Sequence, residues 1–564
     1  MAPLSAPRAA DPAGAAGAAD APGPTRPARG RAPRGRAIVF VGFMGAGKST
    51  AARELAHALG AEPLDTDLLL EERFGHSIAE QWARGGEASF RATEEELVCQ
   101  LLARAGAGAV IALGGGSVLS ERVRRALEPH LTVLLEIDPH RAWERVRGGE
   151  HGAERPLALS RERFFELYSE RLPVYEGIAD ALLPARRAGV AARAAGRLRA
   201  LADAPAGVRM VWATAASGEY PVLLAHGLLG DPPGGPAGGP LLSSPLWPFD
   251  AGRSRPFAVS DDTVAGMYGE RLGAAEALIT IPKGELHKTL ASAEAVWRAL
   301  VRGGMTRADH VVALGGGVVG DLAGFCAATY QRGVPVVHVP TTLVAQVDSA
   351  YGGKTGVDLP EAKNYVGAYH QPTGVFVDPA ALRTLPEREL NAGWVEVLKT
   401  ALIAGGALWQ RVADGGPVDE GVILACARAK LAVVSDDERD AGRRQVLNLG
   451  HTVGHAIETA TGYTRLLHGE AVGLGLLAAL RLSGQDDLHE RVLELLRARS
   501  LPTTLQGFAL GDAPLESLLA ALHRDKKRTG AQVPFVLLDA PGRVRTGARV
   551  ADSELRAAVA ELLG

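Results

Sequence analysis

Short apolar runs alternate with longer stretches of mixed apolar and polar positions along the first third of the chain. AIVFVGF (37–43), AVIALGGG (109–116) and LTVLLEI (131–137) are nearly continuous apolar runs, and two of them contain or end in glycine. Such runs are typical of strands that are buried on both faces of a parallel sheet and connected by helices. The pattern predicts one α/β domain over residues 37–185.

The alternation of strands and helices resumes after a bridge. Residues 186–207 are rich in Ala and Arg and predict a helical linker. A second apolar run, EYPVLLAHGLL (219–229), is followed by a Gly/Pro-rich segment (230–248) that predicts a loop. Strands and helices then alternate to about residue 385, which predicts a second α/β domain over 208–385.

The last third of the chain has a mainly helical pattern. Apolar positions follow helical spacing from 386 to 530, and VPFVLLD (533–539) predicts a final strand before a short terminal helix. We therefore expect a mainly helical domain over 386–564 and an α/β fold for the chain as a whole.

Composition changes this picture at the N-terminus. Residues 1–36 are almost wholly Ala, Pro, Gly and Arg, which predicts a disordered tail whose arginines either contact nucleic acid or are simply solvated. The net charge of the 564 residues is −3, so the whole chain gives no sign of binding nucleic acid or a membrane surface. Cys99, Cys326 and Cys426 form no CxxC motif, so we expect a cytoplasmic protein without disulfides.

The first candidate site is a glycine-rich turn between a predicted strand and a predicted helix. GFMGAGKS (42–49) fits the pattern G-x-x-x-x-G-K-[ST]. In that pattern, backbone N–H groups surround a phosphate, the lysine (Lys48) supplies a positive charge and the hydroxyl (Ser49) a ligand for Mg²⁺. The segment predicts a nucleotide-phosphate site.

Further polar residues follow neighbouring predicted strands. LDTD places Asp65 and Asp67 at the end of a strand, where one can support Mg²⁺ and the other an acceptor hydroxyl. Arg91, Arg155 and Arg171 lie in GEASFR, ERP and ERLPVYE. Each arginine alone could be an ordinary surface charge, but together with the phosphate loop they indicate clamps on a small anionic substrate.

With these motifs in this order, residues 37–185 resemble shikimate kinase. The resemblance implies phosphoryl transfer from Mg²⁺-ATP to shikimate, with Asp67, Lys48 and Arg155 as catalytic residues and 147–156 as a closing lid. It implies ATP contacts from Gly45, Ala46, Gly47, Lys48, Ser49, Thr50 and Arg155; shikimate contacts from Asp67, Arg91, Gly115, Gly116 and Arg171; and magnesium ligation by Ser49 and Asp65.

A second glycine turn follows a strand in VVALGGGVVGDLAGF (311–325), and either binds phosphate or a dinucleotide or is a tight structural turn. Downstream of it, Asp348, Lys354, Lys363 and Asn364 lie in segments that we expect to be loops. Lysines beside Gly-Gly and Asn suit an anionic, polyhydroxylated substrate, although solvated loop lysines would have the same pattern.

Two histidines stand four residues apart in LNLGHTVGHAIE (447–458), which has the pattern of a helix. At about 1.5 Å rise per residue, His451 and His455 share one helical face. They are either a structural pair or part of a metal site. HGE and GWVEVLK add His468 and Glu396. Two imidazoles and one carboxylate are a typical catalytic zinc set.

From about 208 onward the chain resembles 3-dehydroquinate synthase, through G-G-G-V-x-G-D, P-T-T-L-x-A-x-V-D-S, G-G-K-T, L-N-x-G-H-T-x-G-H-A-x-E, H-G-E and D-K-K. The resemblance implies zinc or cobalt on Glu396, His451 and His468; NAD⁺ on Asp261, Glu285, Lys288, Gly316, Gly317, Val318, Asp321, Thr341 and Thr342; and substrate on Arg332, Asp348, Lys354, Lys363, Asn364, Lys399, Arg444, Asn448, His455 and Lys527. It also implies that His455, Lys354, Lys399 and Asp348 are catalytic, and that Arg332 acts across a homodimer interface.

Together the two resemblances imply a bifunctional enzyme of the shikimate pathway. The second half would convert 3-deoxy-D-arabino-heptulosonate 7-phosphate to 3-dehydroquinate, with NAD⁺ regenerated in each cycle. Two alternatives keep the same folds. The second half could be another sugar-phosphate cyclase, or one half could be a nucleotide-binding relic; a relic predicts loss of Lys48, Asp67 or a zinc ligand, and all of these are present.

Overall fold

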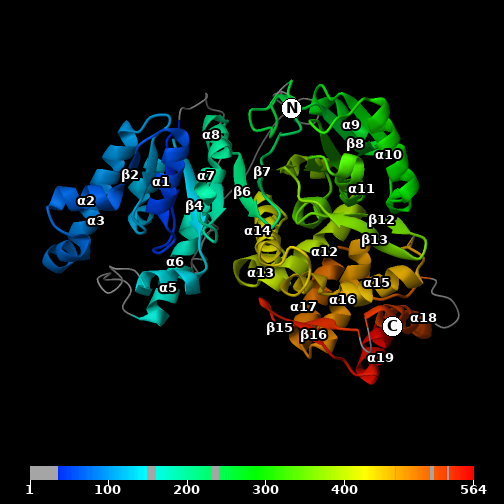
Figure 1. Cartoon of the computed structure of the whole chain (residues 1–564). Helices are drawn as coiled ribbons and strands as arrows, with labels where there is room; N and C mark the ends of the chain where they lie inside the picture. The colour runs from blue at the N-terminus through cyan, green and yellow to red at the C-terminus, as the bar shows by residue number, and fades with distance from the viewer. Residues whose placement is uncertain are drawn as a thin grey trace, which may run out of the picture.

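The computed structural model describes most of the chain, which Figure 1 shows as two halves side by side. The described residues are 36–148, 160–230, 240–250, 252–463, 465–508, 514–529 and 533–564, without the side chains of 523–529. All but the last residue of the predicted tail, most of the predicted lid with Arg155, and the side chain of Lys527 lie outside this part of the chain.

The N-terminal half is an α/β unit whose parallel strands run in the order β2-β3-β1-β4-β5. Its elements are β1 (Ile38–Val41), α1 (Lys48–Leu59), β2 (Pro63–Asp65), α2 (Thr66–Phe74), α3 (Ile78–Arg104), β3 (Val110–Ala112), η1 (Ser117–Leu119), α4 (Glu121–Leu127), β4 (Leu131–Glu136), α5 (Pro139–Gly148), α6 (Arg161–Ile178), β5 (Ala181–Pro184), α7 (Val190–Arg193) and α8 (Ala195–Asp203). The last two occupy the predicted helical linker, and both pack against α1.

A second α/β unit follows, with strands in the order β6-β7-β14-β11-β10-β8-β9. Its elements are β6 (Arg209–Thr214), β7 (Glu219–Leu224), η3 (Leu241–Ser243), β8 (Pro256–Asp261), α9 (Asp262–Leu272), β9 (Ala277–Ile281), η4 (Glu285–His287), α10 (Leu290–Arg302), β10 (His310–Gly315), α11 (Gly317–Thr329), η5 (Tyr330–Arg332), β11 (Val336–Pro340), the π-helical turn η6 (Ala345–Ser349), β12 (Lys354–Leu359), β13 (Ala362–Tyr369), β14 (Gly374–Val377) and η7 (Pro379–Thr384).

The two α/β units share one twelve-stranded sheet. Strand β5 of the first unit pairs in parallel with β6 of the second, with Ala181 opposite Met210 and Leu182 opposite Val211. Strand β6 then pairs antiparallel with β7. In Figure 1, β6 and β7 lie between the two halves. One connected core of buried apolar side chains extends from the first strand into the helical domain.

The remainder is mainly helical, as the sequence predicts. Its elements are α12 (Glu387–Ala404), α13 (Gly406–Ala413), α14 (Glu420–Asp436), η8 (Arg443–Asn448), α15 (His451–Ala460), α16 (His468–Leu482), α17 (Asp486–Ala498), α18 (Pro514–Thr529), β15 (Phe535–Ala540), β16 (Arg543–Ala548) and α19 (Asp552–Glu561). The predicted last strand is therefore the first arm of an antiparallel hairpin, β15–β16.

Two local predictions were wrong. Lys354 and Lys363 lie on the antiparallel hairpin β12–β13 and not on loops, because this two-stranded sheet alternates Gly, Lys and Asn with apolar residues and has no continuous apolar run. The helix with the histidine pair begins at His451. Asn448 belongs to the preceding 3-10 turn η8, because Gly450 at the N-cap has a left-handed conformation (φ +78°) that separates the two elements.

Both predicted nucleotide-binding regions lie at the carboxyl ends of adjacent parallel strands, where loops gather functional groups. The phosphate loop follows β1, the Asp65 segment ends β2 and the Gly114–Gly116 turn follows β3. In the second unit, β8, β10 and β11 are neighbours, and they end at Asp261, Gly315 and Pro340.

Candidate active sites

The phosphate loop of the first site is an open helix N-terminus. Helix α1 begins at Lys48 after Gly47, whose φ of +93° is left-handed and whose backbone ends the turn without a side-chain cap. Lys48 Nζ lies 3.4 Å from the carbonyl oxygen of Phe43. Arg145 supports the turn from outside, since it donates to the carbonyls of Gly45 and Ala46 at 3.3 and 3.4 Å. The N–H groups at the start of α1 are thus presented to an anion.

The turn after β3 brings the predicted substrate residues together. A Cβ placed on Gly114 would lie 2.8 Å from Asp67 Oδ1, and one on Gly115 would lie 3.8 Å from Lys48 Nζ. The guanidinium of Arg91 covers Gly116 closely enough to leave no room for a side chain there. Asp67, Lys48 and Arg91 therefore meet around one backbone turn.

Arg171 closes the same site from helix α6. It is buried, and its Nε atom has no hydrogen-bond partner among the described residues. Tyr175, one turn further along α6, donates its hydroxyl to the carbonyl oxygen of Gly115. Burial raises the pKa of Tyr175 to about 12, so the hydroxyl stays protonated. A buried guanidinium with an unused N–H donor is suited to a carboxylate.

The remaining predicted kinase residues lie near the loop. Ser49 and Thr50 are exposed in the first turn of α1. Asp65 is the N-cap of α2 and accepts a hydrogen bond from the backbone N–H of Asp67 at 3.0 Å. The acidic pair is thereby fixed as one local unit at the end of β2.

Glu94, which the sequence analysis did not name, lies beside the same glycine turn. It is 2% exposed, lies 2.5 Å from Arg91 Nη1 and accepts a hydrogen bond from Ser117 Oγ at 2.7 Å. It stands three residues after Arg91 on α3, a spacing at which opposite charges meet on one helical face. Glu94 holds the Arg91 guanidinium over the glycine turn.

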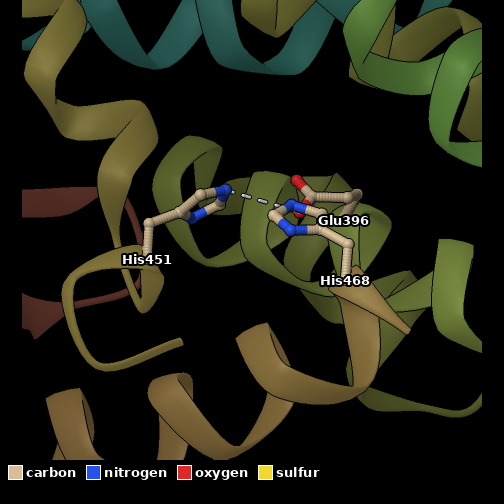
Figure 2. Close-up of side chains that lie close together, drawn as sticks. All are labelled: Glu396, His451 and His468. Atoms are coloured by element: carbon tan, nitrogen blue, oxygen red, sulfur yellow. Dashed lines mark ion pairs between the residues drawn. The ribbon is translucent and has the colours of Figure 1, made fainter. Parts of the chain in front are cut away.

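In the second site, three predicted metal ligands converge from three helices. Glu396 lies on α12, His451 at the start of α15 and His468 at the start of α16, and Figure 2 shows their side chains pointing toward one another. Glu396 Oε1 lies 3.7 Å from His451 Nε2 and 3.5 Å from His468 Nε2. All three ligand atoms lie within 4.8 Å of one another.

The donor set fits a divalent metal. Ligands about 2.0–2.1 Å from a tetrahedral zinc lie about 3.4 Å apart, close to the observed separations. Both oxygens of Glu396 are buried without a hydrogen-bond partner in the described part of the chain, although Lys399 Nζ lies 2.5 Å from Oε2. A buried carboxylate left in this way is satisfied by a cation placed between it and the two imidazoles.

The three predicted ligands differ in their ionisation. Burial by itself raises the pKa of Glu396, but Lys399 and the neighbouring His468 outweigh it and lower that pKa to about 2. Burial, with Lys399 nearby, lowers the pKa of His451 to about 3, so its ring is neutral. Burial disfavours the charged form of His468, yet bonds to Glu396 and Glu458 raise its pKa to about 10.

His455 lies beside the ligand set. Its ring centroid is 5.3 Å from that of His451 and 6.0 Å from that of His468, and its side chain is exposed. His455 also belongs to a second group, with Glu458 and His468, whose ligand atoms all lie within 4.8 Å. The predicted sharing of one helical face by His451 and His455 is confirmed by α15.

A buried chain of charges adjoins Glu396. Lys399 lies 2.9 Å from Asp348 Oδ2, and Lys430 on α14 contacts the other oxygen of Asp348 and donates to its carbonyl at 2.7 Å. Burial opposes ionisation of Asp348, but the two lysines hold its pKa well below the usual range. Lys430 was missed by the sequence analysis; a lysine inside the apolar stretch of α14 was the available signal.

The predicted cofactor residues cluster around the ends of β8, β10 and β11. Helix α11 starts at Gly317, and its N-cap residue, Gly316, provides no side-chain cap. The hydroxyl of Thr341 is buried and has no hydrogen-bond partner among the described residues. Thr342 contacts the Gly316 turn, and Val318 lies in the first turn of α11. An uncapped helix N-terminus beside an unused hydroxyl fits a pyrophosphate group.

Two acidic members of the predicted cofactor set, Glu285 and Asp321, pair with its lysine, Lys288. Lys288 Nζ lies 2.8 Å from Glu285 and 3.3 Å from Asp321. Asp358, which the sequence analysis did not name, is 3.7 Å from the same ammonium. Burial raises the pKa of Asp321 to about 6 despite Lys288. Asp261 instead caps α9 by accepting from the N–H of Val264 at 2.9 Å.

The other predicted substrate residues come from β12, β13, η5 and η8. Lys354 is exposed and pairs with Asp440, while Asn364 has a left-handed backbone (φ +57°) on β13. Arg444 is 1% exposed and donates to the carbonyls of Gly352, at 2.9 Å, and Glu438. Arg332 is exposed on η5 with φ +68°.

Family models match both halves of the chain. Residues 44–199 match shikimate kinase, residues 278–392 match the N-terminal region of 3-dehydroquinate synthase and residues 393–528 match its C-terminal region. The 3-dehydroquinate synthase of Halorhodospira halophila is 44% identical over 352 residues, which are 59% of this chain and 94% of that protein. Within the described residues, no helix is long and apolar enough to cross a membrane.

Solved structures resemble the second half. A 2-deoxy-scyllo-inosose synthase complexed with carbaglucose-6-phosphate, NAD⁺ and Co²⁺ has a TM-score of 0.54 and 25% identity, covering 63% of this chain and all of its own. The 2-epi-5-epi-valiolone synthase of Streptomyces hygroscopicus, with NAD⁺ and Zn²⁺ bound, has a TM-score of 0.52 and 29% identity, covering 61% of this chain and 96% of its own.

Proposed function

The chain belongs to the 3-dehydroquinate synthase family and carries a shikimate kinase domain ahead of the synthase, and we propose residue roles for both active sites on that basis. It is a bifunctional enzyme of the shikimate pathway. The kinase phosphorylates shikimate, and the synthase converts 3-deoxy-D-arabino-heptulosonate 7-phosphate to 3-dehydroquinate and phosphate. The relatives at 44% identity favour this product over those of the cyclases at 25% and 29%.

In the kinase, we propose that the N–H groups of the phosphate loop and Lys48 bind the ATP phosphates, with Ser49 and Asp65 supporting Mg²⁺. Asp67 orients the shikimate hydroxyl, while Arg91 and Arg171 bind the carboxylate. The convergence of Asp67, Lys48 and Arg91 on the Gly114–Gly116 turn supports these roles. Arg155 completes the proposal as the residue that reaches the phosphates from the lid.

In the synthase, Glu396, His451 and His468 would hold zinc or cobalt, and the β8–β10–β11 edge would hold NAD⁺. The metal would polarise substrate hydroxyls and the nicotinamide would accept and return a hydride. We propose that Lys354, Lys363, Asn364 and Lys527 bind the anionic groups of the substrate. The buried ion pair between Lys399 and Asp348 lies beside Glu396.

His455 is proposed as the group that moves protons. Its exposed ring lies 5.3 Å from the ring of His451, which itself lies 3.7 Å from Glu396. An imidazole beside the ligand set can take a proton from the substrate and return it within one cycle. The single observation that carries the proposal is the convergence of three ligand atoms within 4.8 Å beside this histidine.

Two assays on the full-length protein test the proposal. The first follows phosphate release from the heptulosonate phosphate with NAD⁺, with and without a chelator; the second follows ADP formation with shikimate. We expect the native protein to show both activities. After treatment with the chelator and removal of free metal, phosphate release should be lost, whereas ADP formation should persist once Mg²⁺ is restored. Phosphate release that is insensitive to the chelator would contradict the metal assignment.

A pair of variants separates the two histidines. His451→Ala should lose bound zinc, whereas His455→Ala should keep zinc and lose turnover. Zinc content measured on the purified variants, together with phosphate release, checks this division. Loss of zinc from His455→Ala would contradict it.

We further propose a cytoplasmic homodimer formed through the synthase half, with small-molecule substrates and no nucleic-acid or membrane partner. The exposed Arg332, at a left-handed position on η5, is the residue proposed to contact the partner subunit's substrate. Sedimentation of the purified chain, with Arg332→Ala as the variant, tests this proposal: the variant should stay dimeric and lose affinity for the sugar phosphate.

A further inference from the structure

Glu458 on helix α15 is a buried carboxylate to which none of the roles above assigns a function. It stands seven residues after His451, two helical turns along the same face, and is 2% exposed. Its Oε2 atom has no hydrogen-bond partner in the described chain. A carboxylate this deeply buried is expected to have a defined charged partner, and Glu458 has two.

The first partner is a predicted metal ligand. Glu458 Oε1 lies 3.4 Å from His468 Nδ1, whereas His468 Nε2 lies 3.5 Å from Glu396 on the metal side. The two nitrogens of one imidazole therefore face two different carboxylates. A carboxylate on the far nitrogen of a metal-bound histidine fixes the orientation and tautomer of the ring and makes it a stronger ligand.

The second partner comes from the other domain of the synthase. Lys363 Nζ on β13 lies 3.1 Å from the same Oε1 atom and 3.6 Å from Glu285. The ring of Tyr463 covers this ammonium at 4.7 Å. One oxygen of Glu458 thus joins a lysine of the α/β domain to a histidine of the helical domain.

We propose that Glu458 is a positioning residue that orients His468 for the metal and, at the same time, Lys363 for the anionic substrate. This inference rests on the proposed function of the synthase half. His455 is the third charged or titratable group around Glu458, and its ligand atom lies within 4.8 Å of those of Glu458 and His468.

A merely structural ion pair would predict something different. If Glu458 only joined the two domains, its loss would lower the stability of the fold and leave the metal affinity of the folded protein unchanged. If it orients His468, its loss weakens metal binding in protein that is fully folded. Metal affinity, measured apart from turnover, therefore distinguishes the two roles.

The test uses the full-length protein freed of metal, with zinc alone as the probe and a chromogenic chelator as competitor. In Glu458→Gln we expect the dissociation constant for zinc to rise about 10–100-fold, the usual effect of removing such a carboxylate. The KM for the heptulosonate phosphate should also rise, because Lys363 loses its partner.

Two further variants serve as controls. Glu470→Gln removes another buried carboxylate from α16, the helix that carries His468, but this one pairs with Arg388. It should bind zinc within about twofold of the native protein. Lys363→Met should raise KM and keep native zinc affinity, since its link to the metal runs only through Glu458.

Native zinc affinity in Glu458→Gln, or an equal loss in Glu470→Gln, overturns the inference. If Glu458→Gln does not fold, Glu458→Asp keeps the charge but shortens the side chain, and native zinc affinity in that variant also overturns it. A native protein that binds no zinc and releases no phosphate would contradict the proposed function itself, which keeps the two failures apart.

Discussion

Charged side chains beside the predicted metal ligands of the synthase are buried in alternating order of sign. In the synthase, Lys430, Asp348, Lys399 and Glu396 follow one another through direct contacts. Each charge that is removed from water is compensated by a neighbour, and the removal of one member leaves the next uncompensated. Single substitutions in these chains should therefore have effects well beyond the atoms removed.

Lys430→Met should show this effect clearly. The variant leaves Asp348 with Lys399 as its remaining ammonium partner, and breaking a buried pair typically destabilises a protein by about 3–5 kcal/mol. We expect a lower midpoint of thermal unfolding and slow phosphate release, with kinase activity of the folded fraction retained. Unchanged synthase kinetics would contradict the inferred support of Asp348 by Lys430.

Glu94→Gln tests the positioning of Arg91 in the kinase. The change removes the carboxylate that holds the guanidinium over Gly116, and the KM for shikimate should rise roughly tenfold, which corresponds to about 1.4 kcal/mol. Glu87→Gln is the matched control, because Glu87 contacts the same arginine at 3.4 Å but is about half exposed. A similar rise in KM in both variants would exclude a special role for Glu94.

At the scale of elements, the two phosphate loops could be predicted from the sequence, whereas the β12–β13 hairpin could not. Strands such as β1 and β10 are continuous apolar runs because both of their faces are buried. The β12–β13 hairpin has no such signature, since Lys354, Lys363 and Asn364 interrupt its apolar positions. Local sequence also does not determine that β5 pairs with β6 at the domain junction, or which distant charged side chain each buried carboxylate contacts.

The individual site residues also fall into two groups: those that a motif identifies and those whose contacts depend on the fold. His451 and Glu396 fall in recognisable motifs, and the structure brings them together. Glu458 lies within the motif of His451, but its partners His468 and Lys363 come from distant segments. Its contacts depend on packing between α15, α16 and β13, which no spacing along the chain specifies.

Gly450 sets the start of α15 and so the position of His451. Its φ is +78°, and a Cβ there would lie 2.9 Å from the side chain of Leu476 on α16. Gly450→Ala should destabilise the protein by about 1–2 kcal/mol through its backbone and by about 1–3 kcal/mol more through overpacking.

The matched control for this prediction is Gly462→Ala. Gly462 is also left-handed, at φ +66°, but a Cβ would meet nothing within 4 Å. Chemical denaturation of both variants should give the larger loss of unfolding free energy for Gly450→Ala, together with weaker zinc binding. Equal losses of unfolding free energy in the two variants would mean that the close packing of Gly450 against α16 does not affect stability.

At the scale of the whole molecule, the kinase and the synthase are one structural body. Beyond the shared sheet, Arg428 on α14 lies 2.5 Å from Glu136 on β4 and 2.6 Å from Glu176 on α6. Burial disfavours the charged form of Arg428, but these carboxylates raise its pKa above the usual range. Helix α14 also carries Lys430, so one helix contacts the kinase and the synthase site.

The kinase and synthase parts should therefore unfold together. We expect the losses of kinase and synthase activity to coincide during denaturation by urea in the native protein. Arg428→Leu should separate the two curves, because it removes the ion pairs at the junction. Arg411→Leu removes an exposed ion pair between Arg411, on α13, and Asp419. In this variant the two activity curves should still coincide. Separate transitions in the native protein would contradict a single cooperative body.

The junction of β5 and β6 also has a consequence for the order in which the chain is made. Domains generally fold as they leave the ribosome, N-terminal part first. The kinase sheet is then complete up to β5 while Arg209–Thr214 is still being added, and β6 joins a finished edge. Strand β7 follows directly, whereas its other neighbour, β14, is synthesised much later. The kinase thus acts as the template on which the nascent synthase begins its sheet.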